Sequence, residues 1–514
     1  MALPAPQTDA AKRRLAAFGV MVVIFLFAID ATIVSTSMPT IVGKLGGLDL
    51  YSWVFSIYML TSALTTPVFG KLADLFSIRK LMLVGIAVFL LGSALCGAAQ
   101  SMEAMIVFRA IQGLGGGAIY ALSFIVVGVL FPAEQRAKIQ GIISGIWGIA
   151  SILGPLAGGV IVENWSWRWI FFVNLPLSAA ATAFIIIGLK AGRSVKRKPK
   201  LDLGGTFALL IGLLLIFYAL AQSAHARRPL NAETLGLIVA GAFVLAIFYF
   251  VERRAAEPIL PLDLFHIGLY KTCTVVATLC AMGVFGAISY FPLYLQGVLG
   301  ISATRTGLVI LTLSMGWTIG SLLAGQGINK FGYRLAAGTG MFLLAFGYGI
   351  LVMPYFDAGL IAVIISAFGI GTGMGMANLT TLVAAQSSVA RQQIGVATST
   401  VMLFRTFGAA FAVSLMGTVM LGQMRSALTR LRATDSAVAP SLWDKLANPQ
   451  NLLEPATRAE IPIELLPDLI ASLSDALWFA FLVGFALMIF GLAISLLMAN
   501  YTPAHTPRPK ESAE

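Results

Sequence analysis

The chain has 514 residues, of which 58% are hydrophobic and only 11% are charged, and its formal net charge is +12. With a mean hydropathy of +0.90, this composition excludes a soluble globular protein, and with it the nucleic-acid binding that such a basic charge would otherwise suggest. The sequence therefore predicts a polytopic membrane protein.

Apolar runs of about 20 residues, the length that a helix needs to cross roughly 30 Å of hydrocarbon, recur along almost the whole chain. A membrane β-barrel would instead show short segments of alternating hydrophobicity, so the spans are predicted to be helices and the fold all-α. Fourteen transmembrane helices are expected, centred near Asp30, Met59, Phe89, Gly115, Ile149, Thr182, Leu213, Ala242, Met282, Met315, Phe346, Gly369, Phe407 and Gly484.

The basic residues are distributed unequally between the two sides of the predicted membrane. Most of the 34 Lys and Arg residues, including the run from Arg193 to Lys200, fall on the side that also holds both ends of the chain. By the positive-inside rule both termini are cytoplasmic, which requires an even number of spans. A multi-pass protein of the plasma (cytoplasmic or inner) membrane is expected.

The first predicted span, from Met21 to Pro39, carries a carboxylate, Asp30, near its middle. A charge at that depth costs several kcal/mol, so such residues usually face a bundle interior or a water-filled path and mark routes for ions or substrates. Asp30 is therefore a candidate proton-binding group. The alternative is a structural carboxylate that pairs with one arginine or with a helix end.

The fourth predicted span carries a basic residue, Arg109, at a similar depth. The 1.5 Å rise per residue of a helix places Arg109 within a few ångströms of the depth of Asp30, so the two are expected to interact directly or through water. Burial favours the neutral form of a carboxyl group, and a nearby guanidinium favours the charged form. A site that changes its solvent access or its arginine contact can therefore load and release a proton.

The loop between the second and third spans, from Gly70 to Lys80, reads GKLADLFSIRK. Asp74 and Arg79 stand where helix ends meet the cytoplasm, so charge pairs and helix-terminus interactions are predicted to clamp neighbouring helices there. A second copy of the pattern, GQGINKFGYR, runs from Gly325 to Arg334. An internal repeat of six spans is typical of transporters that rock two halves about a site at the midplane.

The fifth span holds a cluster of glycines around one proline. Proline removes one helix hydrogen bond, and glycines permit close approach or bending against the second bundle, so this cluster is a candidate gating element. Ordinary glycine and proline content of a membrane helix is the alternative. The candidate gating residues are Gly70, Asp74, Arg79, Lys80, Gly154, Pro155, Gly158 and Gly159.

Five short motifs, in the expected spans and order, resemble the major facilitator superfamily, and within it the fourteen-span drug/proton antiporter family of multidrug exporters. They are Gly70, Leu72, Asp74, Arg79 and Lys80; Arg109, Gln112, Gly113 and Gly115; Gly141, Gly154, Pro155, Gly158 and Gly159; Asp30 to Pro39; and Trp165 to Pro176. The resemblance covers nearly the whole chain.

This resemblance implies a major facilitator fold, with two pseudo-symmetric six-helix bundles and two inserted helices. The expected divisions are an N-terminal bundle at 1–190, a linker with the two extra helices at 191–260, a C-terminal bundle at 261–421 and 476–500, an extracytoplasmic loop at 422–475 and a cytoplasmic tail at 501–514. The long loop is either solvated and partly helical or a lid over the outer vestibule.

Polar and aromatic residues in the helices expected to line a central cavity are candidates for substrate contact. Aromatic faces together with a carboxylate suit lipophilic cations, through stacking and cation–π contact. Trp53 could equally anchor the interface, Tyr290 could be core, and Arg405 could stabilise packing through backbone carbonyls. The candidates are Trp53, Tyr58, Gln112, Trp147, Tyr290, Asn378 and Arg405.

The leading hypothesis is a proton-coupled exporter, a drug/proton antiporter for hydrophobic or amphipathic cationic small molecules, that works by alternating access. The alternative is an exporter of lipids, glycolipids or a specific metabolite with the same fold. An enzyme is not expected, because His225, His266 and His505 lie apart without a metal or catalytic grouping. No cofactor and no metal are expected. The expected partners are drugs or amphipathic metabolites, protons and membrane lipids, with no nucleic acid, and the protein is expected to be a monomer.

Overall fold

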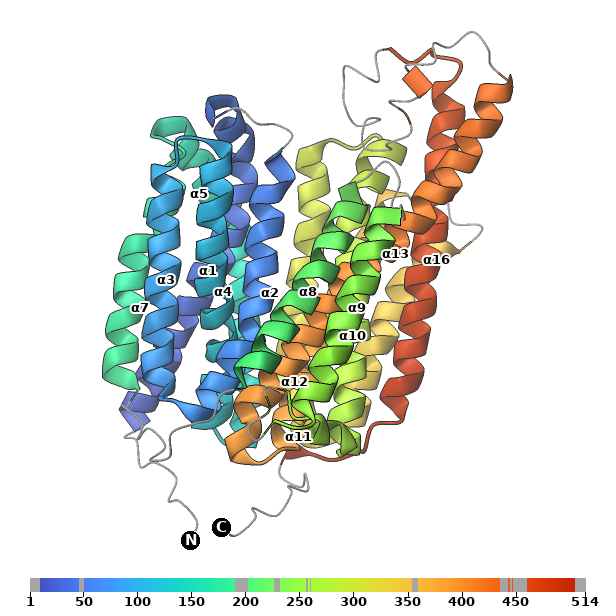
Figure 1. The fold of residues 1–514 in the computed structure, drawn as a ribbon. Helices are drawn as coiled ribbons and strands as arrows, with labels where there is room; N and C mark the ends of the chain where they lie inside the picture. The colour runs from blue at the N-terminus through green and yellow to red at the C-terminus, as the bar shows by residue number, and fades with distance from the viewer. Residues whose placement is uncertain are drawn as a thin grey trace.

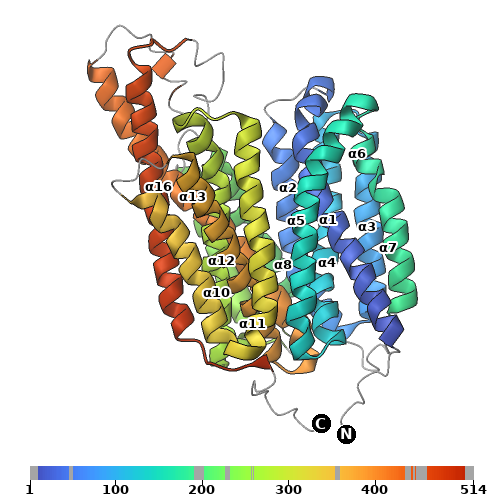
Figure 2. The same ribbon diagram turned by 180° about the vertical axis from the view of Figure 1, so that it is seen from behind.

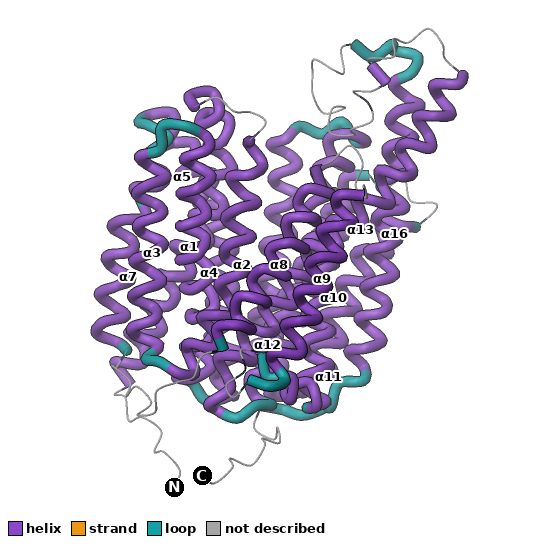
Figure 3. Tube along the Cα trace, viewed as in Figure 1, coloured by secondary structure: helices purple, strands orange, loops and turns teal. Residues whose placement is uncertain are grey.

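A computed structural model describes residues 10–45, 50–189, 202–225, 232–255, 258, 260–353, 359–434, 442–443, 446 and 460–503. Within these ranges the chain forms long helices joined by short loops, and it contains no strand (Figure 3). The predicted all-α fold is confirmed.

The first bundle is formed by the N-terminal part of the chain, drawn from blue to teal in Figure 1. A short helix, α6, runs into α7 almost without a break, so the two together make one crossing. The helices are α1 (Ala10–Leu45), α2 (Tyr51–Leu75), α3 (Ile78–Ala98), α4 (Met102–Leu130), α5 (Ala133–Asn164), α6 (Trp169–Phe172) and α7 (Asn174–Gly188).

The second bundle is formed by the C-terminal part of the chain and lies beside the first. Its longest helix, α11, is broken at Gly332, where φ is 80°, a backbone conformation that only glycine adopts without strain. It therefore provides two crossings. The helices are α10 (Gly268–Leu293), α11 (Ala303–Val352), α12 (Leu360–Ser387), α13 (Ile394–Thr434) and α16 (Leu466–Leu496), with short helical turns at η2 (Leu262–His266), η3 (Tyr294–Val298) and η4 (Arg391–Gln393).

Two further helices, α8 (Leu203–His225) and α9 (Ala232–Glu252), lie between the bundles in the chain. Helix α8 packs across the line where α2 meets α13, and its Leu213 shares an apolar cluster with Leu60 of α2 and Leu403 of α13. Helix α9 packs chiefly on α8 and leaves side chains such as Phe243 exposed. The inserted pair is thus attached to the outside of both bundles.

Eleven helices of the described chain are long and apolar enough to cross a membrane. Helix α11 is one of them and covers two crossings, and α5 and the shorter apolar α8 complete the set. This arrangement is consistent with the fourteen predicted spans. Helix α1 starts and helix α16 ends on the same face of the molecule, called here the termini-side face (Figure 1).

Helices α13 and α16 extend past the other helices on the face opposite the termini (Figure 1). The sequence places the end of one span near 421 and the start of the last near 476, yet α13 continues to Thr434 and α16 begins at Leu466. Hydropathy locates the end of an apolar run, not the end of a helix, so parts of the segment expected as an extracytoplasmic loop are helical, as the partly helical alternative allows. Most of the intervening loop lies outside the described residues.

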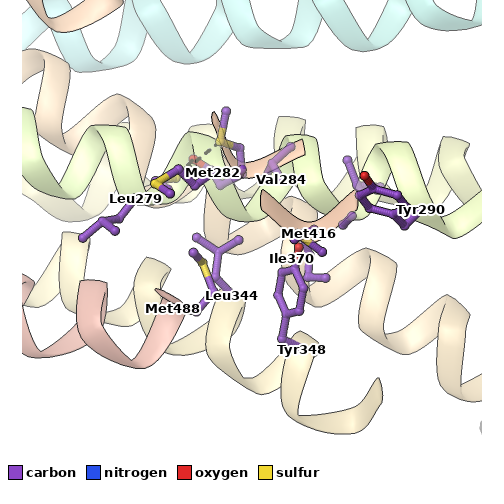
Figure 4. Close-up of a cluster of buried hydrophobic side chains, with 14 of the residues drawn as sticks. Leu279, Met282, Val284, Tyr290, Leu344, Tyr348, Ile370, Met416 and Met488 are labelled. Carbon is purple, nitrogen blue, oxygen red and sulfur yellow. Dashed lines mark hydrogen bonds between the residues drawn. The ribbon is translucent and has the colours of Figure 1, made fainter. Parts of the chain in front are cut away.

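The interior of the second bundle is a packed apolar core (Figure 4). Two tyrosines in it satisfy their hydroxyl groups locally: Tyr290 donates to the carbonyl of Val413 at 2.6 Å, and Tyr348 donates to the carbonyl of Gly283 at 2.5 Å. A buried hydroxyl without such a partner would destabilise the core. These bonds tie α10 to α13 and α11 to α10.

Close contact between α3 and α4 in the first bundle depends on Gly92. A side chain at this position would collide with the backbone of Gln112, which is buried. Small residues of this kind let membrane helices approach closely. Gly92 thereby fixes the depth at which α4 presents Gln112 to the bundle interior.

We expect Gly92→Ala to lower the free energy of unfolding by about 1–3 kcal/mol, because the added methyl group must displace the α4 backbone. Thermal unfolding of the purified protein in detergent measures this change. The matched control is Gly236→Ala on α9, where an added Cβ meets no atom within 4 Å. Equal melting temperatures for the two variants would contradict the proposed packing.

Candidate functional site

The centre of the first bundle holds a fully buried carboxylate, Asp30 of α1. Its Oδ2 accepts a hydrogen bond from Nη1 of Arg109 on α4 at 2.8 Å. Its Oδ1 accepts from Nε2 of Gln112 at 2.8 Å and from Nδ2 of Asn174, the first residue of α7, at 3.0 Å. The expected contact between Asp30 and Arg109 is present and direct.

A second layer of contacts holds the partners of Asp30 in place. Arg109 also donates to the side-chain oxygen of Gln112 at 2.9 Å, and its guanidinium lies 4.0 Å from the centre of the Tyr58 ring on α2. Asn174 also donates to the hydroxyl oxygen of Ser93 on α3 at 2.9 Å. The network therefore joins α1, α2, α3, α4 and α7 around one negative charge.

The chemistry of this network fits the charged form of Asp30. All three groups that contact the carboxylate, from Arg109, Gln112 and Asn174, are hydrogen-bond donors, and an ionised carboxylate only accepts. A neutral acid still accepts hydrogen bonds, but it lacks the negative charge that strengthens them. Protonation of Asp30 would therefore weaken its bonds to Arg109, Gln112 and Asn174.

Aromatic side chains connect this network to the boundary between the bundles. The ring of Phe27 lies 5.9 Å from that of Tyr58 and 5.8 Å from that of Trp147 on α5. Trp147 in turn stacks on Trp317 of α11, with ring centres 6.3 Å apart. Figure 2 shows α5 beside α11, so these two indoles meet across the bundles.

Trp317 was not among the residues expected to line a cavity. Its indole Nε1 is buried and has no hydrogen-bond partner among the described residues. The side-chain oxygen of Asn378 on α12 is also buried and also lacks a hydrogen-bond partner among the described residues. Buried polar atoms without partners are uncommon in folded proteins, so both atoms are places where a ligand or water can form a hydrogen bond.

The remaining cavity candidates lie in different surroundings. Trp53 contacts Tyr218 of the inserted helix α8, with ring centres 5.5 Å apart, and so faces the outside of the bundles. Tyr290 is part of the second-bundle core, the packing alternative considered for it. Arg405 of α13 is half-buried and forms no ion pair with any described residue. Its role in substrate binding stays a prediction.

The two bundles are joined at the termini-side face by Asp74, near the end of α2. Its Oδ1 accepts from the backbone N–H of Gly395 and its Oδ2 from that of Val396, both at 2.8 Å. These N–H groups belong to the first turn of α13, where backbone donors lack helical partners and a negative charge is favoured. Asp74 therefore contacts a helix N-terminus and not a basic side chain, and its role as a clamp stays a prediction.

The other residues of this loop contribute differently. Gly70 lies against Ser399 of α13, and any side chain there would collide with it. Arg79 and Lys80 form no ion pair with the described residues. Only Gly70 and Asp74 of the four predicted gating residues in this loop thus have a described contact with the second bundle.

A second connection between the bundles involves Gln140 of α5 and Gln386 of α12, which the sequence analysis did not identify. Nε2 of Gln140 donates to Oε1 of Gln386 at 3.1 Å. Nε2 of Gln386 donates to the carbonyl of Phe124 on α4 at 3.3 Å. Neither glutamine stands in a recognisable pattern, so only their proximity in space reveals the contact.

The glycine cluster of α5 is not arranged as expected. Gly154 lies against Thr32 of α1, inside the first bundle, whereas Gly148 faces Thr318 of α11 in the second. Gly158 is buried, and a Cβ on Gly159 would meet no atom within 4 Å. The side chain of Pro155 lies outside the described residues. Glycine spacing predicts a face of small residues but does not say which neighbour that face meets.

Metal-ligating side chains do not gather in groups of three or more anywhere in the described ranges. The three cysteines, Cys96, Cys273 and Cys280, are buried and not joined by disulfides.

Comparisons with known proteins agree with this arrangement. The family model described as Major Facilitator Superfamily matches residues 20–413. The chain is 35% identical to the multidrug transporter protein MdtP of Bacillus subtilis, over 95% of this chain and 93% of that protein. It is 32% identical to multidrug resistance protein 3 of Bacillus subtilis, over 95% of this chain and 96% of that protein. The crystal structure of the human organic anion transporter MFSD10 shares the fold, with a TM-score of 0.61 at 14% identity, over 93% of this chain and 99% of that one.

Removal of one partner of the buried ion pair is expected to be costly. Asp30→Asn leaves the Arg109 guanidinium buried without a counter-charge, which should lower the free energy of unfolding by about 3–5 kcal/mol. The double variant Asp30→Asn with Arg109→Gln should recover part of this loss. A double-mutant cycle measured by thermal unfolding in detergent tests the coupling, and strictly additive effects would contradict it.

The contact between Asp74 and α13 is expected to hold the bundles together on the termini-side face. Asp74→Asn keeps one acceptor oxygen but replaces the other with an amino group, which cannot accept from the N–H group of α13. Loss of this bond should let the bundles separate, so spin labels at Val84 on α3 and Phe331 on α11 should move apart. Double electron–electron resonance in lipid nanodiscs measures their distance. Glu103→Gln, the same change at an exposed carboxylate, should leave the distance distribution unaltered.

Proposed function

The chain belongs to the major facilitator superfamily, and from this premise we propose that it exports hydrophobic or amphipathic cationic molecules in exchange for protons. The coarser statement, a multidrug efflux transporter and not an enzyme, follows from the family model and the relatives named above. The finer statement, proton antiport, rests on the network around Asp30.

The observation that carries the proposal is the buried carboxylate of Asp30, which is held by three donors. An ionisable side chain at this depth is expensive, and its usual purpose in membrane proteins is a route for ions or protons. A permanent structural pair would be served equally well by a neutral hydrogen-bonded pair, which avoids the desolvation of two charges. We therefore assign to Asp30 the role of proton carrier and to Arg109 the role of its counter-charge.

Proton exchange requires a second conformation. Asp30 has no exposed surface when the bundles meet at the termini-side face through Asp74 and Gln386. In the proposed cycle, water reaches the network from the face opposite the termini while these contacts hold, and protonation of Asp30 loosens its bonds to Gln112, Asn174 and Arg109. The contacts then break, and Asp30 releases its proton on the termini side. Alternating access then consists of two states that differ in which face is closed.

Substrate and proton are coupled through neighbouring side chains. Tyr58 contacts the Arg109 guanidinium and also lies against Phe27, which contacts Trp147. A shift of Arg109 on protonation would therefore move the aromatic surface that we propose to bind substrate. Aromatic faces attract organic cations, and Trp317 and Asn378 offer one unpaired donor and one unpaired acceptor from the opposite bundle.

The proposed setting is the cell membrane with both termini in the cytoplasm. The basic residues of the sequence favour this orientation, and α1 begins on the same face on which α16 ends. In this orientation, the contacts made by Asp74 and Gln386 close the cytoplasmic side. In the proposed cycle, drug is released outward and a proton enters from outside while this side is closed and the opposite face opens locally.

Proteoliposomes with an imposed pH gradient test the proposal. Wild-type protein should move an aromatic cation against the proton flow, and addition of the drug should accelerate proton movement. Asp30→Asn should reduce both to the level of empty liposomes, because an amide cannot carry the proton. Drug uptake that runs in the same direction as the proton would overturn antiport.

The control is Asp468→Asn, an equally conservative change at an exposed carboxylate in the first turn of α16. This variant should transport like the wild type. A panel of cationic, neutral and anionic aromatic compounds should rank in that order of rate. Thermal unfolding should first establish that the Asp30→Asn protein is folded. If this folded variant still exchanges protons in response to drug as fast as the wild type, Asp30 is not the carrier.

A further inference from the structure

We propose that a groove between the inserted helices binds the headgroup of an aminophospholipid whose free ammonium group pairs with Asp202 and whose phosphate pairs with Arg254. The groove is a cavity of about 480 Å³ lined by Asp202, Ile247, Phe250, Val251, Arg254 and Ala255. It lies outside the Asp30 network and the aromatic pair, so the inference is independent of the proposed transport cycle.

The position of the groove matches the level of lipid headgroups. Asp202 directly precedes α8, and Arg254 lies two residues beyond the end of α9. Both helix ends lie toward the termini-side face (Figure 1). Acyl chains would extend from this level along the exposed side of α9, where Phe250 is 64% exposed and Phe243 is 67% exposed. Because α9 packs chiefly on α8, this side faces the lipid.

The groove offers one acid and one base that do not neutralise each other. No ion pair joins Asp202 to Arg254, although both residues line the groove. Arg254 is exposed. Two opposite charges that line one cavity without contact suit a ligand that carries both signs, such as a zwitterionic headgroup.

Asp202 has a structural role that uses only part of its carboxylate. Its Oδ1 accepts from the backbone N–H of Gly205 at 2.8 Å, which caps the first turn of α8. Its Oδ2 has no hydrogen-bond partner among the described residues.

The choice of a primary ammonium over a quaternary one follows from hydrogen bonding. An ammonium group with N–H donors forms a charge-assisted hydrogen bond with a carboxylate, whereas a trimethylammonium group has no N–H to donate. The arginine end favours phosphate through its planar set of donors. Phosphatidylethanolamine meets both requirements, phosphatidylcholine lacks the donors, and phosphatidylglycerol lacks the cation.

Native mass spectrometry of the full-length protein, titrated with each of these three lipids in detergent, tests the proposal. Wild type should retain phosphatidylethanolamine about tenfold more strongly than phosphatidylcholine or phosphatidylglycerol, the factor expected for one charge-assisted hydrogen bond. Asp202→Asn should lose this preference, while the asparagine still caps α8. Arg254→Gln should weaken binding of phosphatidylethanolamine about tenfold.

The matched control is Arg253→Gln, because Arg253 lies 5.7 Å from the ring centre of Tyr249 and does not line the groove. This variant should bind the lipids like the wild type. Equal retention of all three lipids by the wild type would overturn the proposal, as would an unchanged preference in Asp202→Asn. A preference for phosphatidylglycerol that depends only on Arg254 would indicate a simple basic surface and would also overturn it.

Discussion

The ion pair between Asp30 and Arg109 is the interaction on which the first bundle depends. Each charge is fully buried, so neither can remain in place without the other. Five helices contribute side chains to the network, and their packing distances are set by what the pair requires. Gly92 illustrates this constraint, because its lack of a side chain lets α4 bring Gln112 close enough to contact Asp30. The same network that holds the bundle together is therefore also the site at which we propose proton exchange.

The contact between the bundles uses a different physical principle. Asp74 binds the exposed N–H groups at the start of α13, and Gln140 binds Gln386. These are a few polar bonds at one face, and the aromatic pair of Trp147 and Trp317 lies deeper. Bonds of this kind can be exchanged for bonds with water at modest cost. An interface built from them suits the separation and rejoining of the bundles in the proposed cycle.

The inserted helices add a surface that the two bundles do not provide. Helix α8 packs against both α2 and α13, the same pair of helices that Asp74 joins. Any movement of the bundles relative to each other must therefore be accommodated at α8. A lipid held between α8 and α9 would be in contact with this moving part. The inserted pair thus offers a physical route by which the membrane can influence the transporter.

The sequence by itself determined the class of fold, the number of spans and the presence of a buried acid, because hydropathy and the cost of a charge in lipid act locally along the chain. It also placed Asp30 and Arg109 at one depth, since helix rise converts sequence position into depth. Asn174 lay within a recognised motif, yet nothing in the motif indicated that its amide reaches Asp30. Tertiary structure alone decided that Asp74 binds the start of α13, that Gly154 faces α1 and that Trp147 meets Trp317. These contacts depend on how helices rotate and pack against distant neighbours, which no local pattern records.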